Sequence, residues 1–126
     1  ATISAVKQQF PAQRLVACME LHTFSSLDSR FLSEYKNAMD LADLKIVFVD
    51  ENTFAQKKLP ILTEAEIQLA FGHHEIKYFN NSLKLFNFLL EQKLINSIYL
   101  FMSSGTFGQM DLNKLAYDLV SLDKST

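Results

Sequence analysis

Four strand-like runs alternate with helix-like segments along the chain, and this alternation restricts the fold more than any other feature. The first run, Arg14–Glu20, is apolar at every position between its two charged ends. Such continuous hydrophobicity is typical of strands that are covered on both faces in a parallel sheet. Further strands are expected at Lys45–Asp50, Glu75–Phe79 and Ser97–Met102 because these segments are rich in β-branched, aromatic and other apolar residues.

Helices are expected between these strands wherever apolar residues recur every three or four positions. Thr63 with Glu66 has the form of a capping box, Gly72 is a stop signal, and Asn81 is an N-cap for the helix that follows. Ser25 with Asp28 forms a similar box further upstream. The expected helices span 1–9, 27–40, 64–71, 82–94 and 112–122.

Strand and helix thus alternate four times, which predicts an α/β, Rossmann-like three-layer domain with a mainly parallel sheet and helices on both faces. With the strand order 3-2-1-4, the first and fourth strands are neighbours at the point where the winding reverses. Ligands of such sheets bind there, at the carboxyl ends of the strands. We therefore expect residues 20–26 to lie beside residues 103–108.

Composition sets bounds on this domain. The 126 residues suit one domain, and the net charge of -2, without a cluster of Lys or Arg, argues against a nucleic-acid partner. The apolar runs are far shorter than the ~20 residues of a membrane span, so no membrane partner is expected.

The single cysteine, Cys18, falls in a buried run and is interpreted as a core residue of a cytoplasmic protein. Because the chain begins at Ala1 without an initiator Met, we expect a fragment of a longer protein.

The segment Ser103–Gly108 is the most distinctive candidate for ligand contact. It contains two of the three glycines and lies between a strand and a helix, where free backbone N–H groups suit a phosphate or a carboxylate. An ordinary tight turn explains the same composition. The chain has neither a GxGxxG fingerprint nor a GxxxxGK[ST] loop, so it is not expected to bind a nucleotide by itself.

The histidines offer few other candidate ligand-binding or metal sites. His22 follows the first strand among hydroxyl side chains, where an imidazole could hold an anion. The adjacent His73 and His74 lack a second ligand pair, so they are interpreted as surface residues and no metal site is expected. No Ser/His/Asp arrangement points to a catalytic residue in this chain.

Two motifs resemble a known family. The run Glu20-Leu21-His22-Thr23-Phe24-Ser25-Ser26 after the first strand, together with Met102-Ser103-Ser104-Gly105-Thr106-Phe107-Gly108 after the fourth, is similar to the C-terminal domain of the Mur ligases. The resemblance covers essentially the whole chain. It is closest to the branch that joins L-alanyl-γ-D-glutamyl-meso-diaminopimelate to UDP-N-acetylmuramate in peptidoglycan recycling. The branch that adds L-alanine, and a stand-alone Rossmann-like binding module, remain alternatives.

The resemblance implies a three-domain parent enzyme, in which this chain is the domain that closes over the site and binds the incoming amino acid or peptide. ATP and Mg²⁺ would be held mainly by a central domain that the chain lacks, and they would activate the muramoyl carboxylate as an acyl phosphate. The isolated chain is therefore expected to be inactive and to carry no cofactor. It departs from related ligases at Leu21 and Ser26, where they often have Pro and a basic residue, so the cation for the peptide carboxylates is unassigned between His22 and Arg30.

Carried onto this sequence, the resemblance places two groups of residues near the substrate. The group after the first strand comprises His22, Thr23, Ser25, Ser26 and Arg30, and the group after the fourth comprises Ser103, Ser104, Gly105, Thr106 and Phe107.

Overall fold

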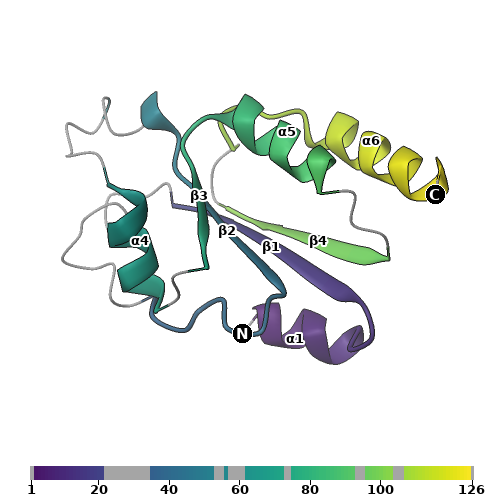
Figure 1. Cartoon of the computed structure of the whole chain (residues 1–126), viewed down its shortest axis with the longest axis horizontal. Coiled ribbons are helices and arrows are strands. Elements are labelled where there is room, and N and C mark those ends of the chain that lie inside the picture. The colour runs from purple at the N-terminus through teal and green to yellow at the C-terminus, as the bar shows by residue number, and fades with distance from the viewer. Residues whose placement is uncertain are drawn as a thin grey trace.

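A computed structural model of the chain describes residues 2–21, 35–52, 56, 62–72, 75–92, 96–103 and 107–125. Its centre is a sheet of parallel strands in the order β3-β2-β1-β4 (Figure 1). The strands are β1 (Arg14–Glu20), β2 (Leu44–Phe48), β3 (Lys77–Phe79) and β4 (Ser97–Met102). This order and direction confirm the predicted α/β class and the adjacency of the first and fourth strands.

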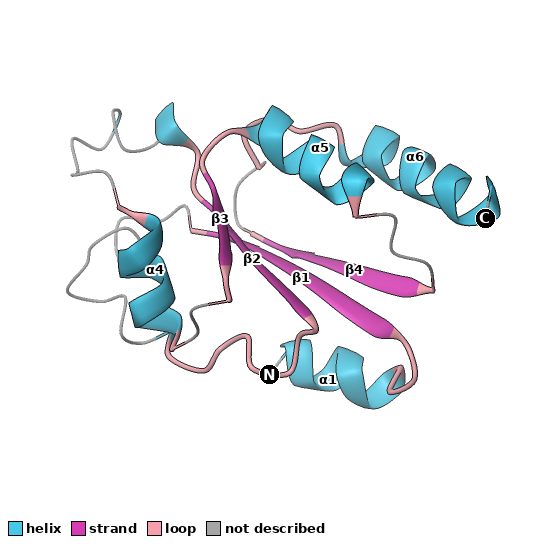
Figure 2. Ribbon diagram, in the orientation of Figure 1, coloured by secondary structure: helices cyan, strands magenta, loops and turns pink. Residues whose placement is uncertain are grey.

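The helices described are α1 (Thr2–Gln9), α4 (Glu64–Phe71), α5 (Ser82–Glu91) and α6 (Leu112–Ser125). Figure 2 shows α5 and α6 above the sheet, α1 below it and α4 to its left. Two core clusters agree with this arrangement. Leu15 and Ala17 of β1 pack with α1 and α4, whereas Val16 and Cys18 pack with α5 and α6. Because alternate residues of a strand point to opposite faces, β1 is covered on both sides, as its continuous hydrophobicity predicts.

Local sequence signals explain where α4 begins and ends and where α5 begins. The Thr63 hydroxyl accepts from the Glu66 N–H at 3.2 Å, and the Glu66 carboxyl accepts in return from the Thr63 N–H at 3.3 Å. Gly72, in the left-handed region at φ 78°, closes α4. The Asn81 side chain accepts from the Lys84 N–H at 3.1 Å at the start of α5. The caps predicted for α4 and for the start of α5 are thereby confirmed.

The helix expected over 27–40 is wrong in the part that can be described. Residues 22–34, and with them the Ser25–Asp28 box, lie outside the described residues, but Tyr35 is in a 3₁₀ helix and residues 36–41 form turns rather than an α-helix. Asn37 adopts a left-handed φ of 64°, and its N–H donates to the Phe71 carbonyl at the end of α4. Tyr35 stacks on Phe71 and Met39 is fully buried. The apolar spacing that predicted a helix is therefore satisfied by packing against α4.

Cys18 is fully buried in the core, and burial raises the pKa of its thiol. A thiol in such a place is a poor nucleophile, which agrees with its interpretation as a core residue. Among the described helices, none is long and apolar enough to cross a membrane.

Asp43 joins α1 to the sheet. Its Oδ2 accepts from Lys7 Nζ at 2.8 Å and from the Leu15 N–H at 2.8 Å. The hydrogen bonds from Lys7 and from the Leu15 backbone hold the pKa of Asp43 below its usual 3.8. The charged form is thus favoured in the folded chain.

Replacing Asp43 with asparagine is expected to make the stability less sensitive to acid. Because folding lowers the pKa of Asp43, its contribution is complete above pH 3.8 and is lost as the pH falls through the folded-state value. The pair is partly exposed, so the contribution should be below about 1 kcal/mol. Urea unfolding at neutral and acidic pH measures it, with Glu91→Gln at an exposed position of α5 as the control. An equal acid response in the Asp43 variant and the unmodified chain would contradict this account.

Candidate functional site

The candidate site is the edge of the sheet where β1 and β4 end side by side. Met19 pairs with Met102 in the parallel register, so the next residues, Glu20 and Ser103, meet at this edge. The Leu21 N–H then donates to the Phe48 carbonyl at 3.0 Å and continues the β1–β2 ladder past Glu20. This is the reversal point of the sheet, where ligands of open α/β domains bind.

Glu20 links the two strand ends. Its side chain is 7% exposed, and its Oε1 accepts from the Ser103 hydroxyl and, at 3.0 Å, from the Phe107 N–H. A buried carboxyl group needs such donors, and a buried backbone N–H needs such an acceptor. One side chain from β1 therefore fixes both ends of the segment that follows β4.

The Phe107 ring anchors the far end of that segment in the core. Phe107 is 2% exposed. Its ring stacks on Phe48 with the ring centroids 5.8 Å apart, and it meets the Phe101 ring edge-on with the centroids 5.4 Å apart. Its N–H is held by Glu20. The ring is therefore an anchor in the core, and the contact of Phe107 with an incoming peptide stays a prediction.

A left-handed turn follows this anchor. Phe107, Gly108 and Gln109 have φ values of 53°, 64° and 62°. A Cβ on Gly108 would lie 3.2 Å from Cζ of Phe48, 3.2 Å from Cβ of Ser82 and 3.4 Å from Oδ2 of Asp50. Glycine thus brings the turn into close contact with the start of α5 and the end of β2.

Gly108→Ala is expected to lower the free energy of unfolding by about 1 to 2 kcal/mol, because a Cβ is strained at this φ and crowds the Phe48 ring. Gly72→Ala is the matched control. Its φ is 78°, but its Cβ would meet only the Asn37 and Lys36 side chains, at 3.3 and 3.6 Å. Urea unfolding of both variants separates backbone strain from packing. Equal losses would show that the close approach at Gly108 costs nothing.

The start of α6 differs from the expected anion-binding site. The Asp111 Oδ1 accepts from the Lys114 N–H at 2.9 Å, so this side chain caps the helix. Its carboxylate satisfies one of the free donors and adds negative charge at the positive end of the helix dipole. The helix N-terminus is therefore less suited to a phosphate. The anion contact predicted for Ser103–Gly108 stays a prediction, because residues 104–106 lie outside the described residues.

A hollow of about 250 Å³ lies next to the turn, between α5 and α6. Apolar residues of α5 and charged residues at the start of α6 both contribute to its wall. The lining residues are Ser82, Leu83, Phe86, Met110, Asp111 and Lys114.

Only part of the predicted site can be placed. Ser103 lies exposed at the end of β4, bonded to Glu20, and Phe107 lies in the core. The others fall outside the described residues: His22, Thr23, Ser25, Ser26, Arg30, Ser104, Gly105 and Thr106. Their roles stay predictions.

Sequence reasoning missed Glu20 as a site residue. The available signal was an acid at the end of an otherwise apolar strand, next to the distinctive segment after the fourth strand. Within the described ranges no group of three or more His, Cys, Asp or Glu side chains could hold a metal ion. His73 and His74 lie outside them.

Comparison with known proteins adds no relative. No family model matches the sequence, and no curated protein or solved structure matches it significantly. The resemblance to the Mur ligases therefore depends on the two loop motifs alone.

Proposed function

We propose that this chain is the substrate-binding and closing domain of an ATP-dependent ligase of the Mur type. The reaction would join the tripeptide L-alanyl-γ-D-glutamyl-meso-diaminopimelate to UDP-N-acetylmuramate, as in the murein peptide ligase. The supporting observation is that the two motifs that resemble this family follow β1 and β4 and are joined there through Glu20. Motifs distant in sequence thus meet at the edge where ligands of open α/β sheets generally bind.

The role proposed for this edge is to position the incoming peptide. An acyl phosphate is lost to water unless the attacking amine is held close and the site is closed. A domain that binds the peptide and then rotates over the muramoyl group would meet both needs. Glu20 is a positioning residue in this scheme, since it holds the Ser103 hydroxyl and the Phe107 backbone.

The sequence has no GxxxxGK[ST] loop for the ATP phosphates. At the described ends of β1 and β4 the Glu20 carboxyl group is already bonded to Ser103 and Phe107, and no described group of three or more His, Cys, Asp or Glu side chains could hold a metal ion. We therefore assign the nucleotide to another domain of the parent enzyme, and no step of the chemistry is assigned to residues of this chain.

The parent protein provides the test. Its gene is expected to encode a GxxxxGK[ST] motif upstream of this chain, and the purified protein should hydrolyse ATP when given UDP-N-acetylmuramate and the tripeptide. Turnover with L-alanine instead of the tripeptide would favour the L-alanine branch. A gene that starts at Ala1 would contradict the proposal.

Ser103→Trp in the parent enzyme tests the assigned edge. The bulky ring at this exposed position should raise the KM for the tripeptide or abolish addition, while binding of UDP-N-acetylmuramate is retained. Asn87→Trp, at an exposed position on α5, is the matched control. Unchanged tripeptide kinetics in Ser103→Trp would overturn the assignment of this edge.

A further inference from the structure

The backbone of β3 has an outer side that faces away from β2. The Phe79 carbonyl points toward β2, because it accepts from the Val49 N–H at 2.9 Å. Successive residues of a strand direct their N–H and C=O groups to opposite sides. The groups of Tyr78, and those of Ile76 just before β3, therefore point outward. At a sheet edge such groups pair readily with another strand.

Two side chains of α4 bind these outer groups. Glu64 Oε2 accepts from the Tyr78 N–H at 3.3 Å. Gln68 Nε2 donates to the Ile76 carbonyl at 3.1 Å. A residue in a neighbouring parallel strand would form the same pair of bonds, one to each side of Lys77. Glu64 and Gln68, one helical turn apart, therefore take the place of a strand residue opposite Lys77.

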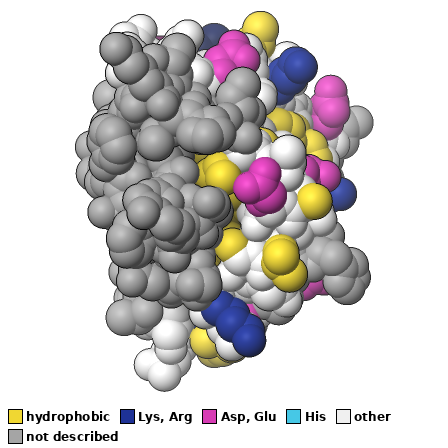
Figure 3. Space-filling model, turned by 90° about the vertical axis from the view of Figure 1, so that its left-hand side faces the viewer, with side chains coloured by type: hydrophobic (Ala, Val, Ile, Leu, Met, Phe, Trp, Pro, Cys, Tyr) yellow, Lys and Arg dark blue, Asp and Glu magenta, His cyan; other side chains and the backbone are white. Residues whose placement is uncertain are grey.

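The position of α4 over this edge depends on apolar contacts as well. Ile67 and Phe71 are fully buried in the core on the α1 side of the sheet, whereas Leu69 is 84% exposed. Figure 3 views the molecule from the α4 side, and the described surface there shows acidic side chains beside hydrophobic ones. The helix thus docks with one apolar face and holds a polar latch, the Glu64 and Gln68 side chains, at the edge of β3.

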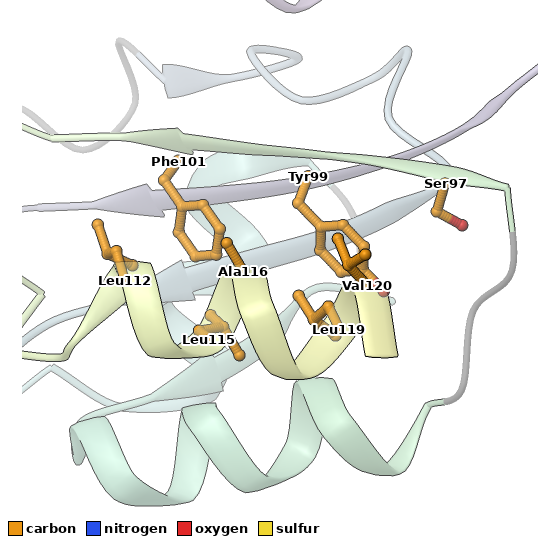
Figure 4. A pocket seen from close by; sticks show the side chains of 8 residues that line it. All are labelled: Ser97, Tyr99, Phe101, Leu112, Leu115, Ala116, Leu119 and Val120. Atoms are coloured by element: carbon orange, nitrogen blue, oxygen red, sulfur yellow. The ribbon is translucent and has the colours of Figure 1, made fainter. Parts of the chain in front are cut away.

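The contact of α6 with β4 is of another kind. Figure 4 shows Tyr99 and Phe101 of β4 next to Ala116 of α6, around a hollow of about 270 Å³ that is lined mainly by apolar side chains. Apolar packing is non-directional, whereas a hydrogen bond fixes one donor against one acceptor. The helix α4 therefore does more than cover hydrophobic surface, because its latch occupies specific backbone groups of β3.

We propose that the outer edge of β3 is a strand-pairing surface that the Glu64–Gln68 latch holds closed against a second copy of this chain. Two uncovered edges fit each other about a two-fold axis through Tyr78. In that antiparallel arrangement each Tyr78 N–H would donate to the Tyr78 carbonyl of the other copy, and Lys77 would lie opposite Phe79 rather than another lysine. The Glu64 carboxylate occupies the same N–H, so latch and pairing exclude each other.

Sedimentation equilibrium of the chain and its variants tests the proposal. Glu64→Ala/Gln68→Ala should associate at least about 10-fold more tightly than the unmodified chain, with concentration-dependent amide shifts centred on residues 76–79. Leu69→Ala, at an exposed position of the same helix, should not. Circular dichroism confirms that each variant is folded.

Two single variants separate the hydrogen bonds from side-chain volume and charge. Glu64→Gln keeps an acceptor for the Tyr78 N–H and should leave association unchanged. Gln68→Glu removes the donor and places a carboxylate against the Ile76 carbonyl, so it should promote association even if the double variant does not fold. A folded Glu64→Ala/Gln68→Ala or Gln68→Glu chain that associates no more than the unmodified chain would overturn the proposal. Equal association of Glu64→Gln and Gln68→Glu, or amide shifts away from residues 76–79, would overturn it as well.

Discussion

Phe107→Ala is expected to lower the free energy of unfolding by about 3 to 4 kcal/mol, the range for removing a buried aromatic ring from a packed core. The ring contacts Phe48 of β2 and Phe101 of β4, so its loss leaves a cavity between the sheet and α6. Denaturant unfolding measures the loss.

Phe86→Ala is the comparison that isolates the effect of burial. Phe86 lies on α5 and is only half-buried, so its truncation should cost clearly less than that of Phe107. In Phe107→Ala the amides of residues 107–109 should also exchange faster with solvent than those of β1, because their anchor is gone. A loss below about 1 kcal/mol would mean that the ring is not the anchor of this segment.

Glu20→Ala is expected to cost about 2 kcal/mol, because it leaves the buried Phe107 N–H without its acceptor. Glu20→Gln keeps an acceptor oxygen of the same shape and should cost less than about 1 kcal/mol. The difference between the two variants in urea unfolding reports the hydrogen bond rather than the volume of the side chain.

The same pair of variants separates positioning from stability in the parent enzyme. Glu20→Ala should raise the KM for the tripeptide, and Glu20→Gln should restore most of the unmodified value. Equal stability losses for alanine and glutamine would contradict the role given to Glu20. Unchanged tripeptide KM in Glu20→Ala would restrict that role to stability.

Much of the fold could be predicted from short-range pattern. The bounds of β1 and β4 agree with the sequence, because a short continuous apolar run bounded by polar residues favours a strand of a parallel sheet. The order of the strands followed from alternation and right-handed crossovers. β3 begins at Lys77 rather than Glu75, and the Glu75 carboxyl pairs with Lys45 Nζ at 2.9 Å. That ion pair joins residues far apart in sequence, so local pattern did not indicate it.

Long-range contacts also explain the other differences. The turn at Asn37 depends on Phe71, and the position of Phe107 depends on Glu20, Phe48 and Phe101. Composition marked the segment after β4 as a loop with small residues, but it did not show that the aromatic side chain at its end points inward. Sequence thus predicted which strand ends meet, whereas the direction of each side chain at that edge required the structure.

The central claim is that the edge formed by the ends of β1 and β4 binds the incoming peptide. A titration of the isotopically labelled chain with L-alanyl-γ-D-glutamyl-meso-diaminopimelate, followed by amide chemical shifts, tests it most directly. We expect saturable shifts at Glu20, Ser103 and residues 107–109, and much weaker ones with L-alanine or UDP-N-acetylmuramate. Absence of shifts at this edge, with or without shifts elsewhere, would contradict the account.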